Sequence, residues 1–180
     1  EPPADALQVL GRDGEALVEL GAHPADFLRI ARQPSETTEF MLVRMLAYCM
    51  EYGEGIALTE GVAAVDEPAV LVRDLTGRIT AWIEVGAPDA ERLHRGSKLA
   101  DRAALYVHRD PAPLLAQYAG SRIHRAAEIP VYDFGTDFLR GAAARLQRRS
   151  KLVLSVTERE VYLDIDGQNF STTIAAHRAG

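Results

Sequence analysis

The spacing of apolar residues changes along the chain between a period typical of strands and a period typical of helices. Apolar runs at residues 7–10 and 15–20, separated by a Gly/Asp turn, predict an N-terminal β-hairpin. Residues 27–30 form a third strand-like stretch. A helix is then expected, with Ser35 as its N-cap and Gly53 marking its end.

The rest of the chain alternates strand-like and helix-like stretches. Strands are expected at residues 62–65, 70–72, 79–85, 103–107 and 129–134, although 70–72 also fits a short helical turn. Helices are expected at residues 88–99, 110–118 and 136–149. A closing meander is expected at residues 152–156, 161–165 and 170–174. Strand–helix–strand units give parallel pairs, so the pattern predicts an α/β fold with a mixed central sheet flanked by helices.

Length and composition narrow the class of protein. The chain has 180 residues, which favours a single domain spanning 1–180. Its single cysteine, Cys49, excludes an intramolecular disulfide and a cysteine-rich zinc module. The net charge of -6 argues against strong nonspecific binding of nucleic acid, but it leaves room for a local basic cleft. No apolar run is long enough to span a membrane and no signal peptide is apparent, so we expect a cytoplasmic protein without membrane contacts. The oligomeric state stays open.

Glu84 is the first candidate functional residue. It lies near the end of the predicted strand 79–85 and is followed by a Gly-Ala-Pro-Asp turn and a basic helix. If residues 75–78 form a hairpin turn, paired positions sum to about 153, which places Glu84 beside Asp66 and Glu67. Carboxylates gathered at a strand end could bind Mg²⁺ or Mn²⁺ for phosphodiester hydrolysis. Equally, the acidic residues before Pro68 could form a solvated turn.

Helix residues supply further candidates. Glu39 begins an apolar helical stripe, where a carboxylate is costly to bury unless it is paired or binds metal; it could also simply reach solvent. Lys98, or Arg95, could stabilise charge on an attacking water or a phosphate. The alternative is a solvated helix face with charge pairs along it. His108 and His124 are predicted to be isolated histidines without a second metal ligand.

Several stretches of the sequence together resemble the YaeQ family. They lie at residues 32–37, 66–68, 73–77, 82–89, 92–94 and 163–164, and the clearest is Trp-Ile-Glu-Val-Gly-Ala-Pro-Asp at 82–89. The resemblance implies a restriction-endonuclease-like core, as in the PD-(D/E)XK nuclease superfamily, with a variant metal site. It also implies that Glu84 is the acid of the (D/E)XK half-motif and that Asp66 or Glu67 is the upstream acid. The half-motif lysine position is occupied by Gly86, so Lys98 or Arg95 would have to supply that cation.

Three functions follow as hypotheses. The first is a Mg²⁺-dependent nuclease or phosphodiesterase in which Glu84, Asp66 and Glu67 bind metal, Glu39 assists and Lys98 stabilises charge. The second is a noncatalytic regulatory protein that binds nucleic acid or protein and retains the nuclease fold. The third is a structural carboxylate cluster beside an unrelated small-molecule site. Whether the protein is an enzyme is left open, because a fold alone does not give a function.

Overall fold

The chain folds into two compact units, each built from two separate stretches of sequence. The structure is a computed structural model, and it describes residues 7–12, 15–20, 27–31, 35–59, 66–147 and 150–180. Unit 1 comprises residues 1–42 and 134–174, and unit 2 comprises residues 43–133 and 175–180. The prediction of a single domain over residues 1–180 stays a prediction.

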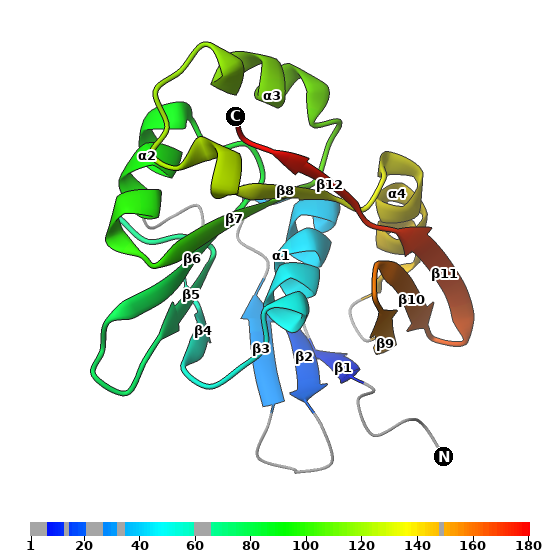
Figure 1. The fold of residues 1–180 in the computed structure, drawn as a ribbon. Helices are drawn as coiled ribbons and strands as arrows, with labels where there is room; N and C mark the ends of the chain where they lie inside the picture. The colour runs from blue at the N-terminus through cyan, green and yellow to red at the C-terminus, as the bar shows by residue number, and fades with distance from the viewer. Residues whose placement is uncertain (1–6, 13–14, 21–26, 32–34, 60–65, 148–149) are drawn as a thin grey trace. The chain divides into compact units, whose positions relative to one another are not determined.

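Unit 2 contains the mixed sheet (Figure 1). Its strands lie in the order β12-β8-β7-β6-β5-β4. Their bounds are β4 Ile56–Leu58, β5 Val70–Arg73, β6 Ile79–Val85, β7 Arg102–Val107, β8 Pro130–Asp133 and β12 Ala175–Arg178. The β6/β7 and β7/β8 pairs are parallel, and the others are antiparallel. The predicted mixed sheet is therefore confirmed. Strands β4 and β12 were missed, and the predicted strand at 62–65 lies outside the described residues.

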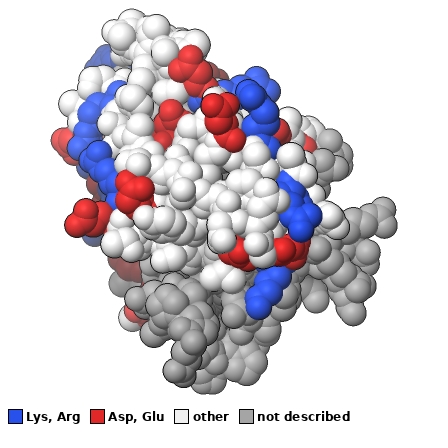
Figure 2. Space-filling model, turned by 90° about the vertical axis from the view of Figure 1, so that its right-hand side faces the viewer, with Lys and Arg blue, Asp and Glu red and all other residues white. Residues whose placement is uncertain are grey.

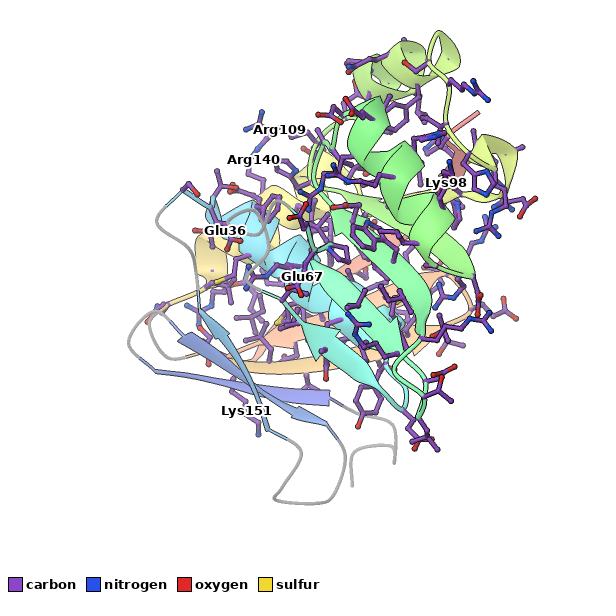
Figure 3. The ribbon with its side chains drawn as sticks, turned by 90° about the vertical axis from the view of Figure 1, so that its left-hand side faces the viewer. Glu36, Glu67, Lys98, Arg109, Arg140 and Lys151 are labelled. Atoms are coloured by element: carbon purple, nitrogen blue, oxygen red, sulfur yellow. The ribbon has the colours of Figure 1, made fainter. Side chains whose placement is uncertain are left out.

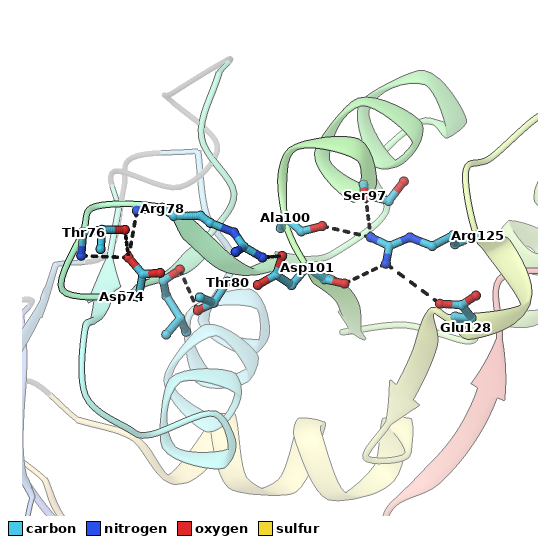
Figure 4. Close-up of polar contacts among 10 residues, drawn as sticks. Asp74, Thr76, Arg78, Thr80, Ser97, Ala100, Asp101, Arg125 and Glu128 are labelled. Carbon is cyan, nitrogen blue, oxygen red and sulfur yellow. Dashed lines mark hydrogen bonds and ion pairs between the residues drawn. The ribbon is translucent and has the colours of Figure 1, made fainter.

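The register of the β5–β6 hairpin agrees with the sequence prediction. Leu71 pairs with Trp82, a sum of 153, and the register shifts by one only between Val72 and Arg73. Asp74 orders the turn, because its Oδ1 accepts hydrogen bonds from the backbone N–H groups of Thr76 (2.9 Å) and Arg78 (3.0 Å) (Figure 4). These bonds place the end of β6, and with it Glu84, opposite the segment that precedes β5.

The helices begin at capping residues that differ from the predicted ones. Helix α1 spans Thr38–Met50, and Thr37 rather than Ser35 caps it, since the Phe40 N–H donates to Thr37 Oγ1 at 3.1 Å. Helix α2 spans Ala90–Leu99, with Asp89 as its N-cap, so the predicted start at residue 88 was two residues early. Helix α3 spans Ala112–Ala119, and a short 3₁₀ turn, η2, covers Ala126–Glu128. None of the helices in the described part of the chain is long and apolar enough to cross a membrane.

The core of unit 2 packs α2 and α3 against the sheet. Helix α2 contacts β6 and β7. Trp82, Leu93, Leu105, Tyr118 and Val131 belong to one buried apolar cluster. All five residues from 81 to 85 are buried, as expected for a strand covered on both faces. Glu84 is therefore a carboxylate inside a hydrophobic core and not at a solvated strand end.

Unit 1 is built on an antiparallel sheet with the strand order β11-β10-β9-β1-β2-β3. The strands are β1 Leu7–Arg12, β2 Glu15–Leu20, β3 Phe27–Ala31, β9 Lys151–Thr157, β10 Glu160–Ile165 and β11 Gln168–Thr173. The hairpin and the meander are confirmed, and pairing of β1 with β9 joins them. Helix α4, Thr136–Arg145, contacts β11 and ends earlier than predicted; residues 148–149 lie outside the described part.

Candidate functional site

Glu84 is almost fully enclosed and has two hydrogen-bond donors on one oxygen. The residue is 2% exposed. Its Oε1 accepts a hydrogen bond from Trp82 Nε1 at 2.8 Å and a second from Arg92 Nε, also at 2.8 Å. Trp82 and Glu84 are two positions apart on β6, so their side chains leave the same face of the strand. The buried carboxylate is thus solvated by protein donors instead of water.

Arg92 reaches Glu84 because the start of α2 is fixed. The Asp89 side chain accepts a hydrogen bond from the Arg92 N–H at 2.7 Å, which sets the first turn of the helix. From there the guanidinium donates to Glu84 and also, through Nη2, to the backbone carbonyl of Glu67 at 2.6 Å. One arginine therefore connects β6, α2 and the segment before β5.

Burial and charge act in opposite directions on Glu84. Burial raises the pKa of its carboxyl above the usual range, and the hydrogen bond and positive charge of Arg92 oppose that shift, with smaller help from Trp82 and Arg95. The pKa of Tyr118 is also raised, first by burial and then by the negative charges of Glu84 and Asp89. The Tyr118 hydroxyl donates to the Pro88 carbonyl at 2.6 Å. The surroundings of Glu84 are therefore apolar, with few but well-placed donors.

Gly96 lets α2 approach Trp82. A Cβ at position 96 would lie 2.3 Å from Trp82 Nε1, much closer than real Cβ contacts. The indole N–H that binds Glu84 therefore occupies the space that any other residue at position 96 would fill. The glycine in the middle of α2 costs helix stability, but it allows the Trp82–Glu84 hydrogen bond.

The backbone explains why a lysine is missing two residues after Glu84. Gly86 has φ +96°, in the region that L side chains rarely adopt. Its N–H donates to the Tyr106 carbonyl at 2.9 Å, so the turn is tied to the neighbouring strand. A lysine at this position would strain the backbone. The Gly-Ala-Pro-Asp sequence indicated a turn here.

The structure does not gather the proposed metal ligands around Glu84. Asp66 and the side chain of Glu67 are exposed, and Glu67 takes part through its backbone carbonyl. Among the residues that the structure describes, no group of three or more His, Cys, Asp or Glu side chains could hold a metal ion. Arg92 and Trp82 are the partners of Glu84 Oε1, and the assignment of Glu84, Asp66 and Glu67 as metal ligands stays a prediction. Glu39 is partly exposed in the first turn of α1 and belongs to unit 1.

Lys98 lies away from Glu84, on another face of α2. Figure 3 shows Lys98 on α2 and Glu67 well apart in that view. The cations that act on Glu84 are Arg92 and Arg95, and Lys98 is not among them. Lys98 instead lines a cavity of about 770 Å³ between α2 and residues 121–125. Of the two candidate replacements for the motif lysine, Arg95 is therefore the one whose charge acts on Glu84.

The cavity contains a histidine pair that the sequence analysis missed. The backbone N–H of His124 donates to His94 Nδ1 at 3.1 Å, and the two rings meet edge to face with centroids 6.5 Å apart. His124 thus lies beside a second histidine, and the prediction that it lacks a second metal ligand stays a prediction. The helical spacing of Glu91, His94 and Lys98 could have predicted that these residues share one face of the helix. Arg92 and Gly96 lie on another face.

Comparison with known proteins identifies the family. A sequence model of this family, described as YaeQ protein, matches residues 20–174. The chain belongs to the YaeQ family. It is 29% identical over 150 residues to the uncharacterized protein YaeQ of Escherichia coli K12 and 28% identical to that of Salmonella typhi, with 83% of both chains covered in each case.

Solved structures of YaeQ proteins have the same fold. The crystal structure of YaeQ from Pseudomonas syringae is 28% identical, covers both chains completely and superposes with a TM-score of 0.77. The YaeQ structure from Xanthomonas axonopodis pv. citri is 24% identical, covers 86% of this chain and 88% of its own, and has a TM-score of 0.75. These comparisons confirm the expected family, and none of the descriptions names an activity.

Proposed function

We propose that this YaeQ protein is a noncatalytic binding protein that retains a nuclease-like sheet, and that it acts through a specific partner. The observation that carries the proposal is the pairing of Glu84 with Arg92 and Trp82 inside the core. A metal ion at Glu84 would have to share the carboxylate with the guanidinium of Arg92, which already binds Oε1. Here a guanidinium already neutralises the charge, and a divalent ion beside it would be repelled.

The absence of a suitably placed lysine supports the same proposal. Gly86 replaces the motif lysine for a backbone reason, and Lys98 faces the cavity instead. The remaining nearby cation, Arg95, stays protonated and so cannot exchange a proton with a water nucleophile. The arrangement therefore lacks a group that could both stabilise and deprotonate an attacking water.

Charge distribution favours a specific protein partner over nonspecific nucleic acid. The net charge is -6. On the face drawn in Figure 2, basic and acidic side chains are interspersed among wide uncharged areas. Nonspecific binding of nucleic acid depends on many cationic contacts with phosphates, which an interspersed surface supplies poorly. The partner we propose is therefore a protein.

Metal binding and cleavage test the proposal directly. Isothermal titration of Mn²⁺ into the wild type and into Glu84→Gln should give no saturable binding in either protein. Neither protein should cleave single-stranded or double-stranded DNA or RNA in Mg²⁺. Circular dichroism confirms that the variant is folded, and glutamine keeps the size and one hydrogen-bond acceptor of the glutamate. Saturable Mn²⁺ binding that Glu84→Gln abolishes would overturn the proposal.

One observation favours a second candidate, a metal-dependent nuclease. The β5–β6 register places Glu84 next to the segment with Asp66 and Glu67, and Arg92 spans the two. If Arg92 rotated away on substrate binding, Glu84 and those two carboxylates would be the Mg²⁺ ligands. Mg²⁺-dependent cleavage by the wild type, lost in both Glu84→Gln and Asp66→Asn, would establish this candidate.

A further inference from the structure

The cavity beside α2 has the size of a small-molecule site. Its volume is about 770 Å³, and sites for small ligands typically measure roughly 300–1,000 Å³. One wall is the face of α2 that carries Glu91, His94 and Lys98, and the other is the loop of residues 121–125 that follows α3. Glu84 is not part of the lining, so the cavity is separate from the buried Glu84 site.

The loop wall of the cavity is held in place. The Ser121 N–H donates to the Tyr118 carbonyl at 2.9 Å, and the Ser121 hydroxyl donates to the Gln117 carbonyl at 2.9 Å. Ile123 is buried in the apolar core of unit 2. The loop therefore has a fixed position before any ligand arrives, which lowers the entropic cost of binding.

Arg125 fixes the loop to the end of α2. Its guanidinium donates to the backbone carbonyls of Ser97 (2.8 Å), Ala100 (2.9 Å) and Asp101 (2.7 Å) (Figure 4). It also lies 3.9 Å from a carboxylate oxygen of Glu128. A cation at this position satisfies carbonyls that the helix leaves without partners. Arg125 thus contributes a positive charge to the wall that cannot move away.

Two further cations at the cavity are not engaged by the protein. Lys98 and Arg122 are exposed and make no hydrogen bond or ion pair with any residue in the described part of the chain. With Arg125, which also lies near Glu128, they make three cations in the cavity lining against one carboxylate in it, Glu91, on a chain whose overall charge is -6. The local sign of charge is therefore opposite to that of the whole molecule.

The histidine pair supplies an oriented hydrogen-bond donor. Because His94 Nδ1 accepts a hydrogen bond from the backbone N–H of His124, the neutral ring of His94 carries its proton on Nε2. The His124 ring packs edge to face against it and restricts its rotation. A fixed N–H donor beside two free cations is the donor set that phosphate oxygens bind.

We infer that this cavity binds a small phosphorylated metabolite, with Lys98 and Arg122 paired to the phosphate and His94 donating from Nε2. The inference goes beyond the proposed binding function and does not depend on it, because no residue of the Glu84 site takes part.

Titration with inorganic pyrophosphate tests this inference. We expect saturable binding by calorimetry in a buffer containing EDTA, which removes any contribution from metal ions. The double variant Lys98→Ala/Arg122→Ala should bind at least about tenfold more weakly, because each substitution removes a charged hydrogen-bond donor to the phosphate. The matched control is Lys151→Ala/Arg159→Ala, which removes the same two charges from exposed positions outside the cavity lining and should bind like the wild type.

Two outcomes would overturn the inference. If the control loses as much affinity as the cavity variant, or if the wild type shows no saturable binding, the cavity does not recognise phosphate specifically. A parallel titration with a 12-nucleotide single-stranded DNA separates the sources of phosphate. Binding of the oligonucleotide but not of pyrophosphate, lost in the cavity variant, would assign the cavity to a nucleic-acid surface and not to a small metabolite.

Discussion

Charged side chains lie on two sides of α2, and their surroundings differ. On the face toward the sheet, the charge of Glu84 is enclosed and paired with Arg92 and Trp82. On the face toward the cavity, Lys98 is exposed, and no residue in the described ranges bonds to it. Paired buried charges hold a fold together, whereas unpaired charges around open space are available to a ligand. The comparison teaches that the more conspicuous sequence motif contains the carboxylate that is buried and paired.

Removal of Arg92 should have the largest effect on stability. The Arg92→Met variant leaves Glu84 buried without the cation that touches it, which costs about 3–5 kcal/mol of unfolding free energy. The loss should be measured by urea denaturation at pH 8. Arg122→Met, an equivalent change on the cavity side, is the control and should be close to wild type. The double variant Glu84→Gln/Arg92→Met should recover most of the loss; if it does not, the pair is not the cause.

The same Arg92→Met variant should show a distinctive pH dependence. Burial already raises the pKa of Glu84, and removal of Arg92 raises it further. A raised pKa means that the folded state holds its proton to higher pH than the unfolded state. The protonated form stabilises the fold fully below the unfolded pKa, and this contribution disappears as the pH rises through the folded pKa. Arg92→Met should therefore regain stability on acidification relative to Glu84→Gln/Arg92→Met; parallel pH profiles would contradict this.

Gly96→Ala should disrupt the contact between α2 and β6, with a smaller loss of stability than Arg92→Met. The added Cβ meets the indole of Trp82, which is buried and cannot move freely. Overpacking of this kind costs about 1–3 kcal/mol, although the better helix propensity of alanine offsets about 1 kcal/mol. Trp82 is the one tryptophan of the sequence, so its fluorescence reports the change directly. Gly53→Ala is the control, because its nearest neighbour would be 3.9 Å away.

Tyr118→Phe, a change in the core near Glu84, should lower the stability of the fold modestly. It removes the hydroxyl that donates to the Pro88 carbonyl at 2.6 Å and leaves the ring in the core. Loss of one such hydrogen bond costs about 0.5–1.5 kcal/mol. Tyr162→Phe, at a tyrosine that is 54% exposed, serves as the matched control in thermal unfolding. Equal changes in the two variants would mean that the Pro88 contact contributes little.

Lys98→Ala/Arg122→Ala should have the smallest effect on stability. Both residues are exposed, and substitutions at such positions usually change the unfolding free energy by no more than about 0.5 kcal/mol. The measurement is urea denaturation without phosphate. A large loss of unfolding free energy would mean that these cations stabilise the fold, and it would contradict the contrast between the two sides of α2.

Local sequence patterns were enough to predict most of the elements and one register. The apolar alternation located β6 at residues 79–85, and the turn at Asp74 to Gly77 fixed its pairing with β5. Both features depend on residues close together in the chain. The resemblance to YaeQ proteins was likewise carried by short stretches, and it held for residues 20–174.

Pairings between distant segments were beyond the sequence analysis. Nothing in residues 7–10 indicates that they pair with residues 151–154, and nothing in residues 175–178 indicates that they join β8. The environment of Glu84 was missed for a related reason. A carboxylate near a strand end looks the same in sequence whether a metal or an arginine neutralises it, and only the packing of α2 decides.

The last strand has a consequence for the order of events during synthesis. Strand β12 pairs with β8, Ala179 is buried, and its N–H donates to the Ile129 carbonyl at 3.1 Å. Because β12 is the last described strand along the chain, the other described strands of the mixed sheet are translated while the edge of β8 is still open. An open strand edge is a template for aggregation. Between translation of β8 and of β12, this edge is therefore exposed to pairing with other chains.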